Sequence, residues 1–285
     1  MSDHPTPVEL QAGDLTLALR PDLGGAIAGL WHRGVPVLRS GEAGALDAPG
    51  ASGGFVMAPY SNRIGFGRFR WQGQDHTLRL NYPGSPHPMH GVAWQRPWQV
   101  TAQREGDVEL HYAHVADADW PFAFTIAQRV VLTPGGLELH LAVTNTDARP
   151  QPMGLGWHPY FPRRSRSRLH AEVAARWETD ANQLPTRQQA QPGIDGDIAH
   201  LAFDHCFEGW QGAARIRDEK FSLRLSSSLR YLMVYTPVDK DFFCVEPVSH
   251  VGNAIHNAEP ASQGLRRLEP GQSLDAWVKL EVATI

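Results

Sequence analysis

Residues 124–144 read FTIAQRVVLTPGGLELHLAVT, two runs of alternating apolar and polar side chains around a Pro-Gly-Gly turn. Successive side chains of a β-strand point to opposite faces, so each run predicts a strand with one buried face. Proline and glycine between two such runs predict a tight connection. The segment therefore predicts an antiparallel hairpin in which Phe124–Leu132 pairs with Leu137–Thr144.

The same two-residue period recurs from one end of the chain to the other. It is clear at Leu15–Arg20, Phe221–Leu225, Tyr231–Tyr235 and Val278–Val282. We find no amphipathic helical pattern longer than about three turns. We therefore expect an all-β protein, a large antiparallel β-sandwich that spans residues 1–285 as a single domain.

Two stretches break the alternation. Gly41–Gly54 is rich in glycine and alanine, and Asp180–Gly196 is polar and contains two prolines. Both are predicted to be long loops, and long loops in compact domains often border a functional site.

The composition shows little charge bias. Hydrophobic residues make up 42% of the 285 and charged residues 20%, a balance that can bury a large core. The 26 Lys and Arg residues face 30 Asp and Glu residues, which gives a formal charge of −4. Binding to nucleic acid or to a membrane surface calls for a basic excess, so the composition argues against both kinds of partner.

Cysteine usage and hydropathy indicate the compartment. Cys206 and Cys244 are too few for a disulfide framework or a cysteine-rich metal site, which fits a reducing environment. Residues 1–5 lack the basic head and apolar run of a signal peptide, and no segment approaches the roughly 18 apolar residues of a membrane span. We therefore expect a cytoplasmic protein.

Residues 154–161, GLGWHPYF, place a histidine among aromatic residues. A residue before proline favours an extended backbone, and proline donates no hydrogen bond to a sheet, so a strand is expected to end here or to lie at an edge. Alternation then places His158 and Tyr160 on one face, with Trp157 on the other. His158 is a candidate for catalysis, although a structural histidine explains this pattern equally well.

Residues 242–247, FFCVEP, end a hydrophobic run in a carboxylate that also precedes a proline. A carboxylate at the end of a buried strand is costly unless it is hydrogen-bonded or functional. Glu246 is therefore a second candidate, with a structural role as the alternative.

Two further motifs complete a pattern. PYSNRIGFGRF at residues 59–69 and HPMHG at residues 87–91 precede the two stretches above. In this order they resemble the landmarks of the aldose 1-epimerases, also called galactose mutarotases, over about Pro59 to Asn253. The chain departs from the family pattern at Pro162, where asparagine is frequent, and at Val92, where glycine is frequent. Its GWHPYFP motif resembles a less studied bacterial branch of the family.

The resemblance implies a β-supersandwich fold and interconversion of the α and β anomers of an aldose. It implies that Glu246 is the catalytic base and His158 the catalytic acid. It also implies substrate-binding roles for Arg63, His90, Asn62 and Asp204, although Asp204 is equally explained as a turn-capping residue. The expected partner is a small sugar. Whether the protein is a monomer or a dimer is left open.

The chemistry of anomer interconversion agrees with these residue types. The sugar ring opens, the C1 aldehyde rotates and the ring closes, so one group takes the C1 hydroxyl proton while another protonates the ring oxygen. Ordinary pKa values of about 4.3 for a carboxylate and about 6.5 for an imidazole leave the first ionised and the second able to donate near neutral pH. Proton transfer between oxygens needs no cofactor and no metal, so none is expected.

Four alternatives remain at this stage. A glycosidase would use Asp204 and Glu246 as its carboxylate pair. A non-catalytic sugar-binding or regulatory sandwich would keep the site without turnover. The basic run at residues 163–168 is predicted to be a solvated loop, but it leaves open an acidic or phosphorylated sugar as the substrate. Histidines at 87, 90, 200 and 205 also permit a zinc site, although they lack the clustered spacing of zinc ligands.

Overall fold

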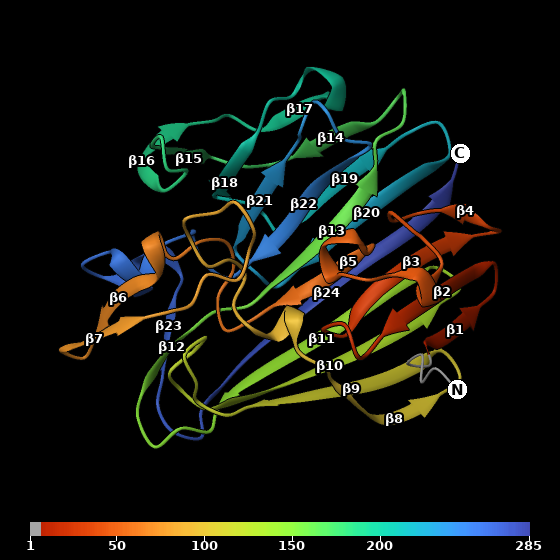
Figure 1. Ribbon diagram of the computed structural model, residues 1–285. Coiled ribbons are helices and arrows are strands. Elements are labelled where there is room, and N and C mark those ends of the chain that lie inside the picture. Colours follow the sequence, from red (N-terminus) through yellow and green to blue (C-terminus); the bar gives the residue numbers. More distant parts are fainter. Residues whose placement is uncertain (1–6) are drawn as a thin grey trace.

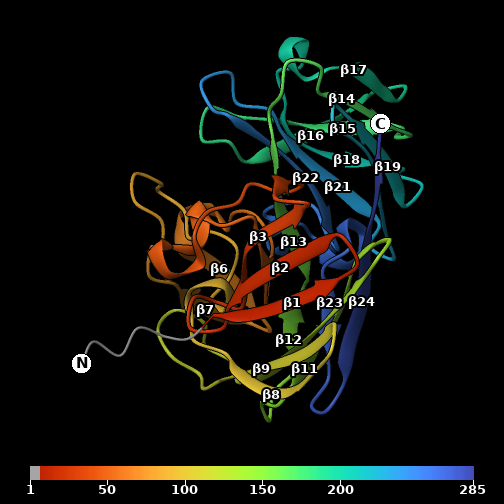
Figure 2. The same cartoon turned by 90° about the vertical axis from the view of Figure 1, so that its right-hand side faces the viewer.

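The alternating runs form strands, and the strands form two large antiparallel sheets that pack against each other (Figure 1). The computed structural model describes residues 7–285. Residues 1–5, on which the expectation about a signal peptide depends, lie outside this range. Figure 2 shows the same arrangement from a direction at right angles to the first.

The first sheet has eleven strands and carries the candidate site. From one edge its order is β1-β2-β3-β5-β13-β22-β21-β18-β15-β16, and β4 pairs with β3. All its ladders are antiparallel. The strands are β1 (Val8–Ala12), β2 (Leu15–Arg20), β3 (Ala26–His32), β4 (Val35–Pro36), β5 (Gly54–Met57), β13 (Gly156–Pro162), β15 (Ala175–Thr179), β16 (Pro185–Ala190), β18 (Asp204–Glu208), β21 (Tyr231–Tyr235) and β22 (Phe242–Val248).

The second sheet has nine strands in the order β17-β14-β19-β20-β24-β11-β10-β9-β8 and is also antiparallel. Its strands are β8 (Gln99–Arg104), β9 (Asp107–His114), β10 (Phe124–Thr133), β11 (Gly136–Asn145), β14 (Arg168–Ala171), β17 (Ile194–Asp197), β19 (Ala213–Arg217), β20 (Phe221–Ser227) and β24 (Ser273–Thr284).

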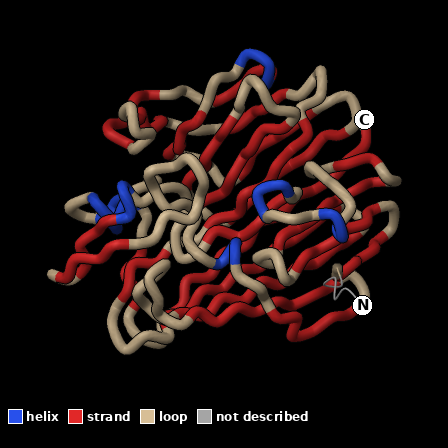
Figure 3. Tube along the Cα trace, in the orientation of Figure 1, coloured by secondary structure: helices blue, strands red, loops and turns tan. Residues whose placement is uncertain are grey.

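Two small two-stranded sheets and seven single-turn 3-10 helices lie outside the large sheets, and residues 7–285 contain no α-helix (Figure 3). The described residues also include no helix that is long and apolar enough to cross a membrane. These elements are β6 (Arg68–Trp71) with β7 (Gln74–Thr77), β12 (Gln151–Met153) with β23 (Arg266–Leu268), η1 (Ala43–Ala45), η2 (Pro49–Ala51), η3 (Gly65–Gly67), η4 (Ala93–Gln95), η5 (Ile198–His200), η6 (Ala254–His256) and η7 (Pro260–Gln263).

The main hydrophobic core takes buried side chains from both sheets. It includes Leu17 and Leu30 of the first sheet and Val130, Leu139 and Val278 of the second. A sandwich buries the inner face of each sheet in this way, which accounts for the two-residue period of the sequence. A second, smaller cluster of buried residues belongs mainly to the eleven-stranded sheet, and it includes Phe55, Tyr160 and Cys244, which lie beside the functional candidates described below.

The hairpin predicted from residues 124–144 is confirmed as β10 and β11. Thr133 pairs with Gly136, so Pro134 and Gly135 form a two-residue connection. Gly136 has φ +149°, and a Cβ at this position would lie 2.1 Å from the carbonyl oxygen of Leu280 on β24. Glycine is therefore required where the neighbouring strand passes the turn.

The loop predicted for Asp180–Gly196 is only partly correct. Its middle forms β16, and its end forms most of β17. Each of these strands lies at an edge of its sheet, and the side chains of β16 are exposed apart from a half-buried Pro185. An edge strand that is solvated on both faces shows no apolar alternation, so its sequence resembles a loop.

The prediction that the His158-Pro159 segment ends a strand or lies at an edge is wrong. β13 runs through Pro159 to Pro162 in the interior of the sheet, between β5 and β22. Glu246 and Pro247 likewise lie within β22, which continues to Val248. In the register of β13 with β22, Pro159 is opposite Val245 and Pro247 is opposite Trp157, and the ladder is interrupted around them, as described next.

Candidate active site

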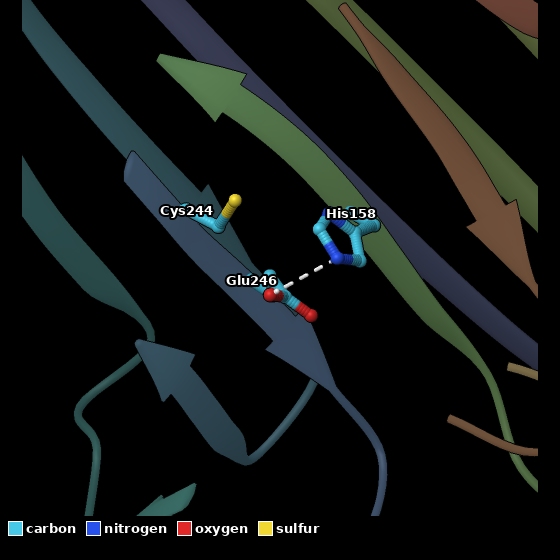
Figure 4. Close-up of side chains that lie close together, drawn as sticks. All are labelled: His158, Cys244 and Glu246. Carbon is cyan, nitrogen blue, oxygen red and sulfur yellow. Dashed lines mark ion pairs between the residues drawn. The ribbon is translucent and has the colours of Figure 1, made fainter. Parts of the chain in front are cut away.

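His158 and Glu246 lie opposite each other on adjacent strands. Gly156 of β13 pairs with Val248 of β22, and Tyr160 pairs with Cys244, so the same register places His158 opposite Glu246. The ladder is interrupted between these two pairs, where each strand carries a proline without an N–H group. His158 Nε2 lies 3.4 Å from Glu246 Oε1 (Figure 4).

The sheet register places this pair in a row of side chains that crosses five strands. Met233 of β21 pairs with Glu246, and Cys206 of β18 pairs with Met233. On the other side, His158 pairs with Phe55 of β5. Residues that are directly opposite in a sheet point to the same face. The row therefore places the site on one face of the eleven-stranded sheet.

Aromatic packing fixes the orientation of the His158 ring. The ring of Phe55 lies 4.8 Å from the imidazole at 28°, and the ring of Tyr160 lies 4.6 Å from it at 26°. Trp94 stacks on Phe55 at 4.9 Å, and the Arg39 guanidinium lies 3.8 Å above the Tyr160 ring. Nδ1 of His158 is buried and has no hydrogen-bond partner among residues 7–285, so stacking orients the ring.

Burial controls the charge of the pair. His158 is 8% exposed and Glu246 is 3% exposed. Desolvation lowers the pKa of His158 to about 3, and the nearby Arg39 acts in the same direction. Desolvation raises the pKa of Glu246 well above its ordinary value, as does Asp204, while Arg63 opposes the shift. Both effects favour a neutral carboxyl group beside a neutral imidazole over an ion pair of the two.

Two hydrogen bonds connect Asn62 and His90. The N–H of His90 donates to the Asn62 carbonyl at 2.9 Å, and the N–H of Asn62 donates to His90 Nδ1 at 3.2 Å. Both residues have left-handed backbones, with φ of +59° and +62°. Such strain in non-glycine residues is typical of functional sites.

His90 is a hydrogen-bond donor that lies beside the pair of His158 and Glu246. Desolvation lowers its pKa well below the ordinary value, as do His158 and Arg63, so the ring is neutral. Because Nδ1 accepts a hydrogen bond, the single ring proton lies on Nε2. The His90 and His158 rings are 5.1 Å apart and nearly perpendicular.

Arg63 connects the site to two more distant elements. Its guanidinium donates to Gln183 Oε1 at 2.8 Å, in the turn between β15 and β16, and lies 3.6 Å from Asp204 at the start of β18. It also donates to the side chain of the adjacent Asn62 at 3.3 Å. The planar guanidinium is thereby held in one orientation with an anion beside it.

The structure brings all six predicted site residues together. They come from β13, β18, β22 and two connecting segments, and the contacts above link them into one group: Asn62, Arg63, His90, His158, Asp204 and Glu246. Sequence reasoning missed Phe55 and Gln183, which have no local pattern that marks them. Tyr160 was predicted to share the face of His158, and this is confirmed.

Other candidates from the sequence have structural environments. His87 Nδ1 accepts from the Phe66 N–H at 2.8 Å, and its Nε2 contacts the Asn182 carbonyl at 2.9 Å, so both ring nitrogens are occupied. In the basic run, Arg163 donates to carbonyl oxygens, and Arg164 pairs with Asp218 at 2.6 Å. These two arginines tie surrounding loops together, which differs from the solvated loop that was predicted.

One group of side chains has a donor set that suits a metal ion. His158, Cys244 and Glu246 each offer one ligand atom, and these atoms lie within 4.8 Å of one another (Figure 4). Cys244 and Glu246 are two residues apart on β22 and therefore point to the same face.

Known proteins match this chain over most of its length. The family model of aldose 1-epimerase matches residues 7–281. YphB, an uncharacterized protein of Escherichia coli K12, is 30% identical over 292 residues, which cover 96% of this chain and 97% of YphB. YihR, a second uncharacterized protein of that strain, is 26% identical and covers 74% of each chain.

Solved structures are similar over almost the whole chain. A crystal structure of an E. coli K12 protein has a TM-score of 0.87 at 29% identity, covering 98% of this chain and 99% of the other. A galactose mutarotase-like protein of Clostridium acetobutylicum has the same fold, with a TM-score of 0.87 at 22% identity and coverage of 98% and 95%. The galactose mutarotase-like sandwich is thus confirmed, and the chain belongs to the aldose 1-epimerase family.

Proposed function

We propose that this protein interconverts the α and β anomers of an aldose, with His158 and Glu246 as the proton-transfer pair. The observation that carries the proposal is the 3.4 Å approach of His158 Nε2 to Glu246 Oε1 in a buried environment. The ring oxygen and the C1 hydroxyl oxygen of a pyranose share one carbon and lie about 2.3 Å apart, so neighbouring acid and base groups can reach one each within about 3 Å.

The pair carries the single proton that the reaction requires. Ring opening needs one group that accepts the C1 hydroxyl proton and one that donates to the ring oxygen. Burial favours the proton on Glu246 in the free protein, which makes Glu246 the initial donor and His158 the initial acceptor. The family resemblance implies the reverse assignment. Both assignments contain one proton, and ring closure returns the proton by the opposite route.

The surrounding polar groups match the hydroxyl groups of a neutral sugar. His90 offers an N–H donor, Arg63 offers guanidinium donors, and Asp204 offers a half-buried carboxylate acceptor. Arg63 and Asp204 lie 3.6 Å apart, so their charges largely compensate each other. A neutral aldose therefore suits this site better than a sugar acid or a sugar phosphate.

Polarimetry of freshly dissolved α-glucose or α-galactose tests the proposal. We expect the protein to accelerate the approach to the equilibrium rotation well above the spontaneous rate. Hydrolysis of aryl glycosides without mutarotation would instead establish a glycosidase. Sugar binding without either reaction, by calorimetry over a panel of aldoses, would establish a binding protein and contradict the proposal.

A further inference from the structure

We propose that His158 Nε2, Cys244 Sγ and one oxygen of Glu246 form an inhibitory binding site for a zinc ion. The three residues occupy adjacent strands in the interior of the sheet, with Cys244 and Glu246 on β22 and His158 on β13 (Figure 4). Zinc binding itself is independent of the reaction proposed above. The inhibitory effect depends on it, because the ion would occupy the two atoms that transfer protons.

The distances nearly match a zinc coordination sphere. Zinc binds sulfur at about 2.3 Å and nitrogen or oxygen at about 2.0–2.2 Å, which separates the ligand atoms of a tetrahedron by about 3.4–3.6 Å. His158 Nε2 and Glu246 Oε1 are already 3.4 Å apart. All three ligand atoms lie within 4.8 Å of one another, so the sulfur needs to approach by roughly 1 Å. A rotation of the Cys244 side chain supplies a movement of this size.

The types of donor favour zinc over harder cations. A thiolate, an imidazole and a carboxylate form a mixed set of sulfur, nitrogen and oxygen ligands, which zinc accepts. Magnesium and calcium bind oxygen ligands and require six or more of them. Three protein ligands leave a fourth position of a zinc tetrahedron open to water or an anion.

The surroundings of the site keep the donors available. Cys244 is buried and forms no disulfide, so its sulfur is free to bind an ion. When zinc binds, an S–Zn bond replaces the S–H bond of Cys244 and an O–Zn bond replaces the O–H bond of Glu246, and both protons leave to solvent. The thiolate and the Glu246 carboxylate then balance the double charge of the ion. Arg63 carries a charge that would repel zinc, but Asp204 lies 3.6 Å from it and offsets this effect.

Zinc titration of the full-length protein, after removal of any histidine tag, tests the binding site. We expect calorimetry to show one zinc ion per chain and no magnesium binding. Cobalt(II) should give a thiolate-to-metal absorption band in the near ultraviolet. Cys244→Ser should weaken zinc binding by at least about tenfold and abolish the band, since serine replaces the soft ligand.

Cys206→Ser is the matched control. Cys206 is the other free cysteine and is also buried on this sheet, but it lies beyond Met233 on β18. We expect this variant to keep wild-type zinc affinity and the cobalt band. Circular dichroism shows whether Cys244→Ser folds. If it does not, His158→Asn removes a different ligand, and it should also weaken zinc binding.

The outcomes separate this inference from the proposed function. Wild-type zinc affinity in a folded Cys244→Ser or His158→Asn protein would overturn the site, as would equal losses in both cysteine variants. Zinc binding that depends on Cys244 in a protein without mutarotase activity would leave the site standing and contradict the proposed function. If both proposals hold, zinc inhibits mutarotation in the wild type and Cys244→Ser requires at least about tenfold more zinc for the same inhibition.

Discussion

The rings of Phe55 and Tyr160 orient the imidazole of His158, because its Nδ1 has no hydrogen-bond partner among residues 7–285. A stacked ring is free to exchange a proton at Nε2 without losing a structural hydrogen bond. The same stacking buries the ring and removes its charge.

Removing either member of the pair should abolish most of the activity. Glu246→Gln keeps the size of the side chain and His158→Asn keeps a smaller polar one, and each is expected to reduce kcat by about 100-fold or more, the usual effect of losing a general acid or base. Saturation-transfer NMR on the two anomers measures the exchange rate directly. Exchange close to wild type in either folded variant would remove that residue from the mechanism.

Stacking predicts a difference between two substitutions at Tyr160. Tyr160→Leu removes the ring that lies 4.6 Å from the imidazole, and kcat should fall by roughly tenfold because a misplaced base reacts slowly. Tyr160→Phe keeps the ring and should retain most of the activity. Equal losses in the two variants would indicate that the hydroxyl group matters and that the stacking does not.

The pH profile should have a broad plateau. Below a pH of about 3 a second proton would bind His158, and above the raised pKa of Glu246 the last proton of the pair would leave. We therefore expect kcat/KM to be flat above about pH 5 and to fall only once the pH exceeds the raised pKa of Glu246. Polarimetry corrected for spontaneous mutarotation measures this. A steep rise centred near pH 6.5 would show that His158 titrates as an exposed histidine does.

Among the elements, the hairpin of β15 and β16 reaches the site from the edge of the sheet. Its turn places Gln183 against Arg63 and the Asn182 carbonyl against His87. Gln183 has a left-handed backbone with φ +61°, which turns its side chain within a tight connection. The hairpin therefore completes the surroundings of Arg63, although it contributes none of the predicted catalytic residues.

Gln183→Ala should impair binding more than turnover. The substitution removes the acceptor that holds the Arg63 guanidinium, so KM should rise by roughly 5–10-fold while kcat changes little. Gln189→Ala, at an exposed position on β16, is the control and should behave as the wild type. An unchanged KM in Gln183→Ala would show that Arg63 keeps its position without the hairpin.

In the whole molecule, the two sheets share one core, so we expect the chain to unfold as a single domain. Buried neutral histidines are part of this structure. His250 lies beneath the site, where its Nε2 accepts from the Ser61 N–H at 3.1 Å and its Nδ1 donates to the Val251 carbonyl at 2.7 Å. Desolvation lowers its pKa to about 4.

Acid should destabilise the fold. The folded-state pKa of His250 lies below the value of about 6.5 in the unfolded chain, so the stability it supports is present above pH 6.5 and is lost as the pH falls toward 4. This single group should reduce the free energy of unfolding by about 3 kcal/mol over that range. Urea unfolding at several pH values measures the loss. A His250→Gln variant should show a shallower dependence, and an identical slope would contradict the assignment.

The sequence alone was sufficient for the fold class, because a two-residue period records which side chains face the core of a sandwich. Through the resemblance of its motifs to those of the aldose 1-epimerases, it also pointed to six residues that the structure brings together. Edge strand β16 escaped prediction because both of its faces are solvated. The interior position of β13 escaped because proline normally excludes a central strand.

Tertiary structure decided the properties that depend on neighbours distant in the sequence. The register of β13 with β22 brings His158 to Glu246, and β5 supplies the ring of Phe55. Burial then moves the pair's proton toward the carboxyl group, whereas ordinary pKa values predict an ionised carboxylate and a protonated imidazole. Desolvation depends on everything packed around a group, so the residue types could be predicted from the sequence and their protonation could not.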